Sequence, residues 1–204
     1  MVSHVEILVE EQSMEIALRQ IVPRVLGDGL SFQVYPYLCK EDLMDKLPSR
    51  LRGYAAWLPP DWRVAVIVDR DDDQCDQLKM RLDEAAHNAG LTTRSTGQDT
   101  MFQVVNRIAI EELEAWFFGD WEAVVAAYPK ANPNIPNKAG YRDPDAILGG
   151  TWEALERCLR RAGYFQTGLR KVEATRSIAH HMDPAKNRST SFQVFRRALT
   201  EMTL

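Results

Sequence analysis

Acidic side chains follow two apolar runs within the first seventy-three residues. Glu10 lies at the end of the run VEILVEE, and Asp69, Asp71 and Asp73 come directly after the run RVAVIV. Carboxylate oxygens are the ligands that hard divalent cations prefer. Without a cation, such a gathering of like charges at the end of buried strands would raise the pKa values of the acids and cost stability. The pattern therefore predicts a metal site for Mg²⁺ or Mn²⁺ on these four residues.

The second acidic run is also compatible with two different roles. Asp72 and Asp73 suit the first turn of a following helix, where acids interact favourably with the helix dipole. The string DRDDDQCDQLKM begins like a calcium loop of the EF-hand type. That loop needs Gly at its sixth position and Glu at its twelfth, whereas this chain has Gln74 and Met80 there. The calcium loop is therefore excluded.

Further acids open a later helix. Glu111, Glu112 and Glu114 follow Ile110 in the segment IEELEAWFFGD. Acids in a first helical turn often only complement the helix dipole. Glu114 lies deeper in the apolar part of this segment, beside Trp116. We predict Glu114 as a further metal ligand or as a catalytic group that supports the ligands.

Positive charge gathers in the last third of the chain. A net charge of −4 excludes a protein whose whole surface grips nucleic acid, so any nucleic-acid contact must be local. The segments RCLRR, LRK, KNR and FRR set a basic region against the acidic strand ends. Lys171, Lys186 and Arg188 are the predicted contacts to the phosphate backbone. The alternative is an ordinary solvated surface.

The strands and helices that must position these residues alternate along the chain. Apolar runs predict strands at residues 5–11, 31–39, 63–69, 91–94 and 104–110, with helical patterns between most of them. The helix near residues 40–58 is expected to be interrupted at Pro48, and the one after residue 110 to break at Gly119. Such alternation predicts an α/β fold with a mostly parallel sheet flanked by helices. In such sheets, functional residues lie at the carboxyl ends of the strands.

The composition divides the chain into three parts. Residues 1–128 form the predicted α/β domain, and residues 129–150, rich in Asn, Pro, Gly and Asp, form a loop or linker. Residues 151–204 are predicted as a helical annex packed on the core, with helices near 151–161, 168–182 and 189–202.

The beginning of the chain carries no targeting signal that we can identify. Its apolar run is short and has no basic flank, which excludes a signal peptide or a membrane span there. The three cysteines are far apart and not in CxxC spacing, so neither a zinc site nor a disulfide framework is expected. We expect a cytoplasmic protein with no membrane contact.

These motifs together resemble a known signature. A Glu at the end of the first strand (ILVEEQSME) and D-x-D at the end of the third (VIVDRDDD) resemble the Toprim signature. With IEELEAWFFGD and the late segment NRSTSFQVF, the chain resembles an uncharacterised bacterial family of Toprim-like proteins, often encoded beside ATPases of the ABC or SMC kind. One departure is Glu11, where Toprim proteins usually have Gly.

The resemblance implies a Rossmann-like core in which the acids hold magnesium for phosphodiester chemistry. Topoisomerases, primases and the nuclease domain of overcoming-lysogenization-defect proteins use this core for such magnesium-dependent chemistry. Our first hypothesis is therefore a metal-dependent nuclease, an effector of ATPase-linked phage defence. In it Asp69 and Asp71 anchor Mg²⁺, and Glu10 bridges a second ion or acts as general base.

Two hypotheses from different classes compete with the nuclease. One is a noncatalytic subunit that docks on an ATPase through Trp57, Trp62 or Trp152, since aromatic residues often anchor interfaces. The chain has no Gly-rich phosphate loop, so any ATPase must be a partner. The second is a receiver-like signalling domain with Asp69 as phosphoacceptor. It is the weakest of the three because no Lys ends a later strand near residue 100.

Overall fold

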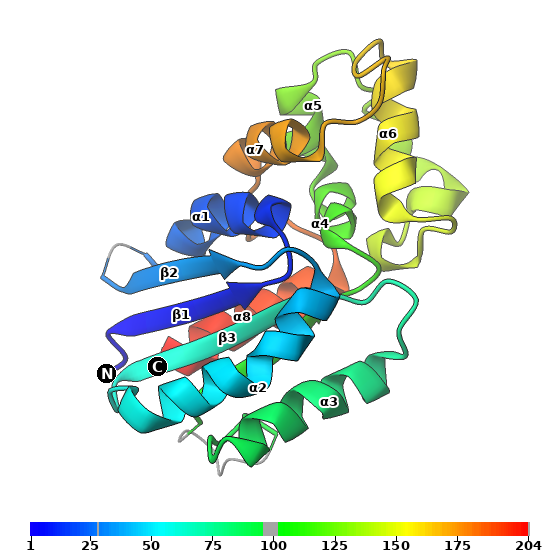
Figure 1. Cartoon of the computed structure of the whole chain (residues 1–204). Coiled ribbons are helices and arrows are strands. Elements are labelled where there is room, and N and C mark those ends of the chain that lie inside the picture. The colour runs from blue at the N-terminus through cyan, green and yellow to red at the C-terminus, as the bar shows by residue number, and fades with distance from the viewer. Residues whose placement is uncertain (28, 96–101, 204) are drawn as a thin grey trace.

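Four parallel strands form the sheet of the structure, a computed structural model that describes residues 1–27, 29–95 and 102–203. The strand order is β2-β1-β3-β4, and Figure 1 shows β2, β1 and β3 side by side in that order. Their bounds are β1 (His4–Val9), β2 (Ser31–Pro36), β3 (Trp62–Asp69) and β4 (Val104–Ala109). The predicted α/β fold with a parallel sheet is confirmed.

The register of the strands brings their carboxyl ends to one edge. Val9 pairs with Pro36 on one side and with Ile67 on the other, and Asp69 pairs with Ala109. Residues that directly follow β1, β3 and β4 therefore meet at the same edge of the sheet. We call this the carboxyl edge.

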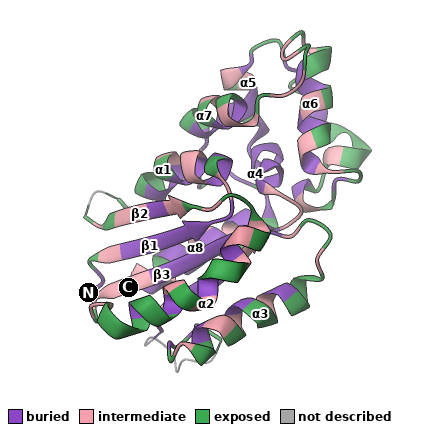
Figure 2. Cartoon of the chain, in the orientation of Figure 1, coloured by how far each residue is buried: buried purple, intermediate pink, exposed green. Residues whose placement is uncertain are grey.

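Helices cover both faces of the sheet (Figure 1). One face carries α1 (Gln12–Leu26) and α8 (Thr190–Thr203), and the opposite face carries α2 (Lys40–Trp57) and α3 (Cys75–Asn88). Figure 2 shows the resulting burial of the central strands. Strands buried on both faces read as continuous apolar runs, which is why β3 is the clearest strand in the sequence.

The remaining helices form a group beside α1. They are α4 (Leu113–Gly119), α5 (Trp121–Ala127), α6 (Thr151–Arg161) and α7 (Lys171–His181). Helix α7 packs on α1 and α5, and α6 packs on α4. The segment between α5 and α6 contains the short 3-10 turns η1 (Ile135–Asn137), η2 (Ala139–Tyr141) and η3 (Pro144–Ala146). Within the described parts of the chain, no helix is long and apolar enough to cross a membrane.

Two local predictions are wrong. Pro48 does not interrupt α2, because the leucines on either side of it bury the same helix face against the sheet, and this packing offsets the hydrogen bond that proline cannot make. The strand expected at residues 91–94 is reduced to a single bridge between Thr93 and Val104. The chain turns there, with the Arg94 N–H donating to the Val104 carbonyl.

The predicted break at Gly119 is confirmed, and the expected C-terminal helices match α6, α7 and α8. Of these three, α8 lies on the sheet, packed on β4 and α1. Helix α8 therefore shares in the main core rather than standing apart from it.

Candidate active site at the carboxyl edge

Glu10 and Asp69 lie next to each other at the carboxyl edge, as predicted. Glu10 directly follows β1, Asp69 is the last residue of β3, and both side chains are buried. The Asp69 backbone N–H donates to Glu10 Oε2 at 3.1 Å. Asp69 Oδ1 is buried and has no hydrogen-bond partner among the described residues. The adjacency of β1 and β3 thus places two carboxylates together, one of them with an open oxygen.

Glu114 joins them from α4. The residue is 1% exposed, and its Oε2 is also buried without a hydrogen-bond partner in the described part of the chain. Burial, followed by the charges of Glu10 and Glu114, raises the pKa of Asp69 well above its usual range. Burial also raises the pKa of Glu10 to about 7 and that of Glu114 to about 7. The charge of Glu114 thus acts on Asp69, so the two side chains share one environment. A role for Glu114 in holding a metal stays a prediction.

Asp71 and Asp73 contact a lysine that the sequence patterns do not single out. Lys40, the first residue of α2, lies 2.7 Å from Asp71 and 2.9 Å from Asp73, and its Nζ donates to the Arg70 carbonyl at 3.0 Å. The signal that could have found it is its position: a lysine that starts the helix after β2 stands at the carboxyl edge.

The two aspartates differ in their relation to Asp69. The charge of Asp71 contributes to the raised pKa of Glu10 and of Asp69, whereas Asp73 is not among those contributions. Asp71 is also exposed and lies beyond the end of β3, so the alternation of strand side chains does not extend to it. A metal role for Asp73 stays a prediction.

The turn after β3 is held against the turn after β4. Asp71 and Glu111 both have positive φ, 48° and 38°, which is rare for residues other than glycine. The Asp71 N–H donates to the Glu111 carbonyl at 3.0 Å, and Arg70 forms an ion pair with the Glu111 side chain. Left-handed backbone costs free energy and persists where surrounding contacts enforce it, which is common at functional sites. No motif in the amino-acid sequence indicates this pairing of turns.

Glu11, at the position where the resemblance leads us to expect glycine, has an ordinary backbone conformation. Its φ of −149° is extended backbone, which any residue can adopt. Glu11 precedes α1 as its N-cap residue, and the Ser13 hydroxyl donates to its carboxylate. The departure therefore leaves the backbone of this turn intact and adds one more carboxylate at the edge.

Lys171 reaches the same edge from the start of α7. Its Nζ lies 3.9 Å from Glu11 Oε1 and 5.7 Å from the centre of the Trp152 ring. Burial acts to lower the pKa of Lys171, but the carboxylates around it, Glu114 foremost, outweigh burial and raise that pKa. Of the three predicted phosphate contacts, Lys171 is the one that the structure brings to the carboxylates.

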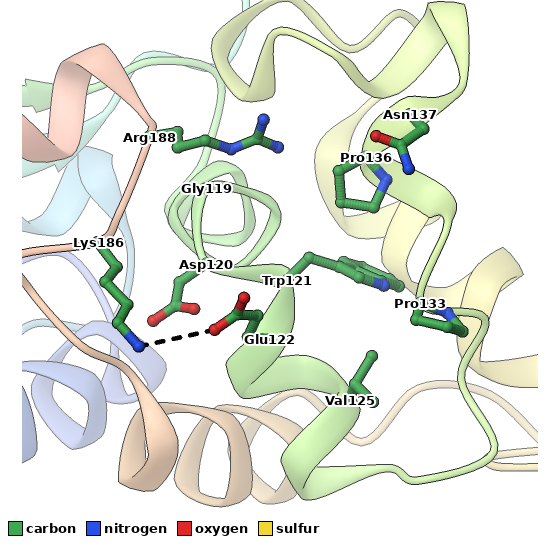
Figure 3. Close-up of a pocket in the computed structure, with 10 residues that line it drawn as sticks. All are labelled: Gly119, Asp120, Trp121, Glu122, Val125, Pro133, Pro136, Asn137, Lys186 and Arg188. Atoms are coloured by element: carbon green, nitrogen blue, oxygen red, sulfur yellow. Dashed lines mark ion pairs between the residues drawn. The ribbon is translucent and has the colours of Figure 1, made fainter.

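Lys186 and Arg188 lie elsewhere, at a cavity of about 450 Å³ between α5, the η1 turn and the segment before α8 (Figure 3). Lys186 forms an ion pair with Glu122 at 3.8 Å, and the Arg188 backbone N–H donates to the Gly119 carbonyl. Among the described residues, none of the carboxylates of the edge lines this cavity. Asp120 and Glu122 line the cavity as well, so the two cations lie at a site of mixed charge that is separate from the carboxyl edge.

The carboxyl edge offers oxygen ligands for a divalent cation, although its side chains are not arranged around one. In the part of the chain that the structure describes, no group of three or more His, Cys, Asp or Glu side chains is arranged to hold a metal ion. Glu10 Oε2 accepts a backbone N–H, and Asp71 is turned toward Lys40. The chemistry of the donors nevertheless fits Mg²⁺ or Mn²⁺, since all are hard oxygens and two buried ones, on Asp69 and Glu114, are open.

The chain belongs to a family described as "Domain of unknown function (DUF4276)", which it matches over residues 9–202. No curated protein and no solved structure matches the chain.

Proposed function

We propose that this DUF4276 protein is a metal-dependent nuclease or a related phosphodiesterase with a Toprim-type carboxylate site. The observation that carries the proposal is the pair of buried, open oxygens on Asp69 and Glu114, beside the buried carboxylate of Glu10. An unpaired carboxylate away from water costs several kcal/mol or else stays protonated. A divalent cation at the edge would remove that cost, which explains why the fold would keep three such acids together.

In this proposal Asp69 and Glu114 hold Mg²⁺ or Mn²⁺. Asp71 joins them by rotating away from Lys40, and Glu10 stays free as the base. Such a rotation is open to Asp71, whose side chain is 48% exposed, but not to the buried acids. When bound, the metal supplies charge neutralisation at a phosphate and a lowered pKa for water.

The chain's own residues have defined tasks in phosphodiester hydrolysis. Glu10, with a pKa of about 7, is suited to accept the proton of the attacking water near neutral pH, and its Oε1 is the oxygen not engaged by the Asp69 N–H. Lys171 and, once released, Lys40 can pair with phosphate oxygens on either side of the acids. Lys186 and Arg188 would contact the nucleic acid farther from the bond that breaks.

A noncatalytic subunit is the second candidate function. The observation that favours it is the Lys40 ammonium, which already neutralises Asp71 and Asp73. Trp57 is 54% exposed and its ring lies 5.8 Å from that of Trp62, so the two offer an aromatic surface to a protein partner. An ATPase encoded nearby is the partner that we propose for either function, with phage defence as the setting.

The nuclease is tested with purified protein, Mn²⁺ and labelled single- and double-stranded DNA and RNA. We expect cleavage, with Glu10→Gln and Asp71→Asn folded but at least about 100-fold slower, as for the loss of a positioned acid or base. Asp72→Asn is the matched control, because Asp72 is exposed and lies one residue from Asp71. If the wild type cleaves none of the four substrates, with and without its ATPase neighbour, the protein is better described as a noncatalytic subunit.

A further inference from the structure

A second cavity, of about 830 Å³ and open to solvent, lies beside the carboxyl end of β2. Aromatic rings and cations share its wall: Tyr35 and Tyr37 come from the end of β2, and Lys46 and Arg50 come from α2. Gln12 lines it as well. Nothing in the proposed hydrolysis uses these side chains.

Arg50 is held in place at this cavity. Its guanidinium carbon lies 4.6 Å from the centre of the Tyr35 ring and 5.0 Å from that of Tyr54, and its Nε donates to the Tyr54 hydroxyl at 3.1 Å. Its Nη2 lies 3.8 Å from the carboxylate of the buried Glu6, and the side chain is still 40% exposed, so a phosphate can reach it from the solvent side. A guanidinium ordered in advance loses little conformational entropy when it pairs with a phosphate.

Lys46 supplies a second cation. It is exposed, and its ion pair with Asp42 is a surface contact between successive turns of α2, of the kind that contributes little free energy. Lys46 can therefore exchange Asp42 for an anionic ligand at small cost.

Tyr37 completes the cavity with a half-buried ring. Burial raises the pKa of Tyr37, and the positive charges of Arg50 and Lys46 oppose that rise, which means that both cations act on its hydroxyl. An aromatic ring beside cations is the combination on which proteins stack an unpaired base while neutralising its phosphate.

The cavity adjoins the carboxyl edge. The Tyr37 N–H donates at 2.8 Å to the carbonyl of Val9, the residue before Glu10, and Gln12 directly follows Glu11. Figure 1 shows the connection from β2 to the start of α2. This connection includes Tyr37, and Lys40, the first residue of α2, contacts Asp71. A chain of nucleotides anchored at Tyr37 would therefore continue toward the carboxylates.

We infer that this cavity binds an unstacked nucleobase and its phosphate, so that the ligand of the carboxyl edge is single-stranded nucleic acid. Bases inside a duplex are stacked on each other and do not offer a face to a tyrosine, whereas single strands do. The inference rests on the proposed function for what happens to the strand, but the binding itself needs no metal.

The test measures binding in a metal chelator, so that neither cleavage nor a metal contributes. Fluorescence anisotropy with labelled oligo-dT and oligo-U is compared with a blunt-ended DNA duplex of the same strand length, long enough to stay paired without a hairpin loop. Tyr37→Ala should weaken single-strand binding by roughly five- to 150-fold, the loss expected for one stacked base. Tyr37→Phe keeps the ring and should bind like wild type. Trp57→Ala, which removes an exposed ring from the far end of α2, should change nothing.

Lys46→Gln tests the phosphate part with a change at an exposed position that leaves the fold intact. It should make the slope of log affinity against log salt concentration shallower by about 0.7, the value for one lost contact to a single strand. The inference is overturned if the duplex binds as tightly as the single strands, or if folded Tyr37→Ala and Lys46→Gln both bind like wild type. Cleavage by Tyr37→Ala at the wild-type rate would leave the nuclease standing and remove only this inference. If the protein binds single strands through Tyr37 but never cleaves them, the inference stands and the proposed nuclease activity fails.

Discussion

Glu10, Asp69, Asp71 and Glu114 share one edge of the sheet, yet they differ in what they can do there. Asp69 and Glu114 are buried and have an open oxygen each, so a bound cation would stabilise their charged forms more than those of the other two acids. Glu10 is partly satisfied by a backbone N–H, which leaves one oxygen for proton transfer. Asp71 is the exposed acid and the one with a lysine partner that it can leave. Environment therefore separates a metal-holding pair from a base and a movable ligand.

The raised pKa of Glu114 makes stability depend on pH. Its value of about 7 in the folded chain lies above the ordinary 4.5, so the folded protein binds more protons than the unfolded chain between these values. Stability must therefore fall as pH rises through this window. In chelator, Glu114→Gln should be more stable than wild type at pH 8, by an amount on the order of 3 kcal/mol, and show no such gain near pH 4.5.

Urea unfolding at several pH values measures this difference. Glu122→Gln, at an exposed position of α5, serves as the control and should track wild type at every pH. Parallel stability curves for Glu114→Gln and wild type would show that Glu114 does not titrate with a raised pKa.

A bound metal ion should offset much of the free-energy cost of ionising the buried carboxylates. Mg²⁺ or Mn²⁺ at ten times its dissociation constant should stabilise the wild type by about 1.4 kcal/mol, because it binds only the folded chain. For a chain of this size that is a rise in melting temperature of roughly 3–5 °C. Asp69→Asn should lose the increment and Asp72→Asn should keep it. Titration calorimetry that detects neither ion on the wild-type protein would contradict the metal site.

At the scale of elements, the residues that end apolar runs were predictable and their partners were not. Glu10 and Asp69 follow runs that can only be buried strands, so their position at the edge follows from the parallel sheet. Lys40 appears in the sequence as one charged residue among several at the start of a helix. Nothing local marks it as the partner of Asp71, because that contact depends on how the β2–α2 connection crosses the edge.

The segments IEELEAWFFGD and NRSTSFQVF contain another contact that the sequence does not reveal. In the fold they contact each other: Asn187 Nδ2 donates to the Trp116 carbonyl at 2.8 Å, and Trp116 Nε1 donates to Ser191 Oγ at 3.1 Å. These buried contacts fix α4, and with it Glu114, against the first turn of α8 and the segment before it. Partners separated by about seventy residues leave no periodic signal in the sequence, so this positioning role could not be read from the motifs themselves.

Gly119 is where this junction is tightest. A Cβ at Gly119 would meet the Asn187 side-chain oxygen and lie 2.8 Å from the Ser189 backbone nitrogen. Gly119→Ala should therefore destabilise the protein by about 1–3 kcal/mol, the range for overpacking a filled site. Gly53→Ala is the matched control, because it lies inside α2 with no described atom within 4 Å of an added Cβ, and alanine there should stabilise by up to about 1 kcal/mol. Urea unfolding compares the two, and equal midpoints would show that α4 tolerates displacement.

At the scale of the whole molecule, charge is divided between two places. The chain carries a net charge of −4, and its carboxyl edge gathers acids with Lys40 and Lys171 as the cations beside them. Lys186 and Arg188 lie at a different cavity, at the opposite end of α4 from Glu114, where Asp120 and Glu122 accompany them. A polyanion long enough to contact both places would bind a metal and lysine at the carboxyl edge. At the cavity of Lys186 and Arg188 it would be held by charge alone. The two contributions should be separable.

Reversing the charges of Lys186 and Arg188 should therefore weaken nucleic-acid binding without changing the affinity for the metal. Lys186→Glu with Arg188→Glu should weaken binding of a long single strand and make its salt slope shallower by about 1.4, which corresponds to two lost phosphate contacts. The affinity of this double variant for Mg²⁺ should not change, because among the described residues none of the carboxylates of the edge lines that cavity.

Lys171→Gln should behave differently. Removing a cation that lies among Glu11, Glu114 and Asp69 should strengthen Mg²⁺ binding while it weakens nucleic-acid binding. Reversal of Arg52 and Arg81, exposed on α2 and α3, controls for the change in net charge alone. If the double reversal at Lys186 and Arg188 binds as tightly as wild type across the salt series, these residues are ordinary surface charges and the strand leaves the edge by another route.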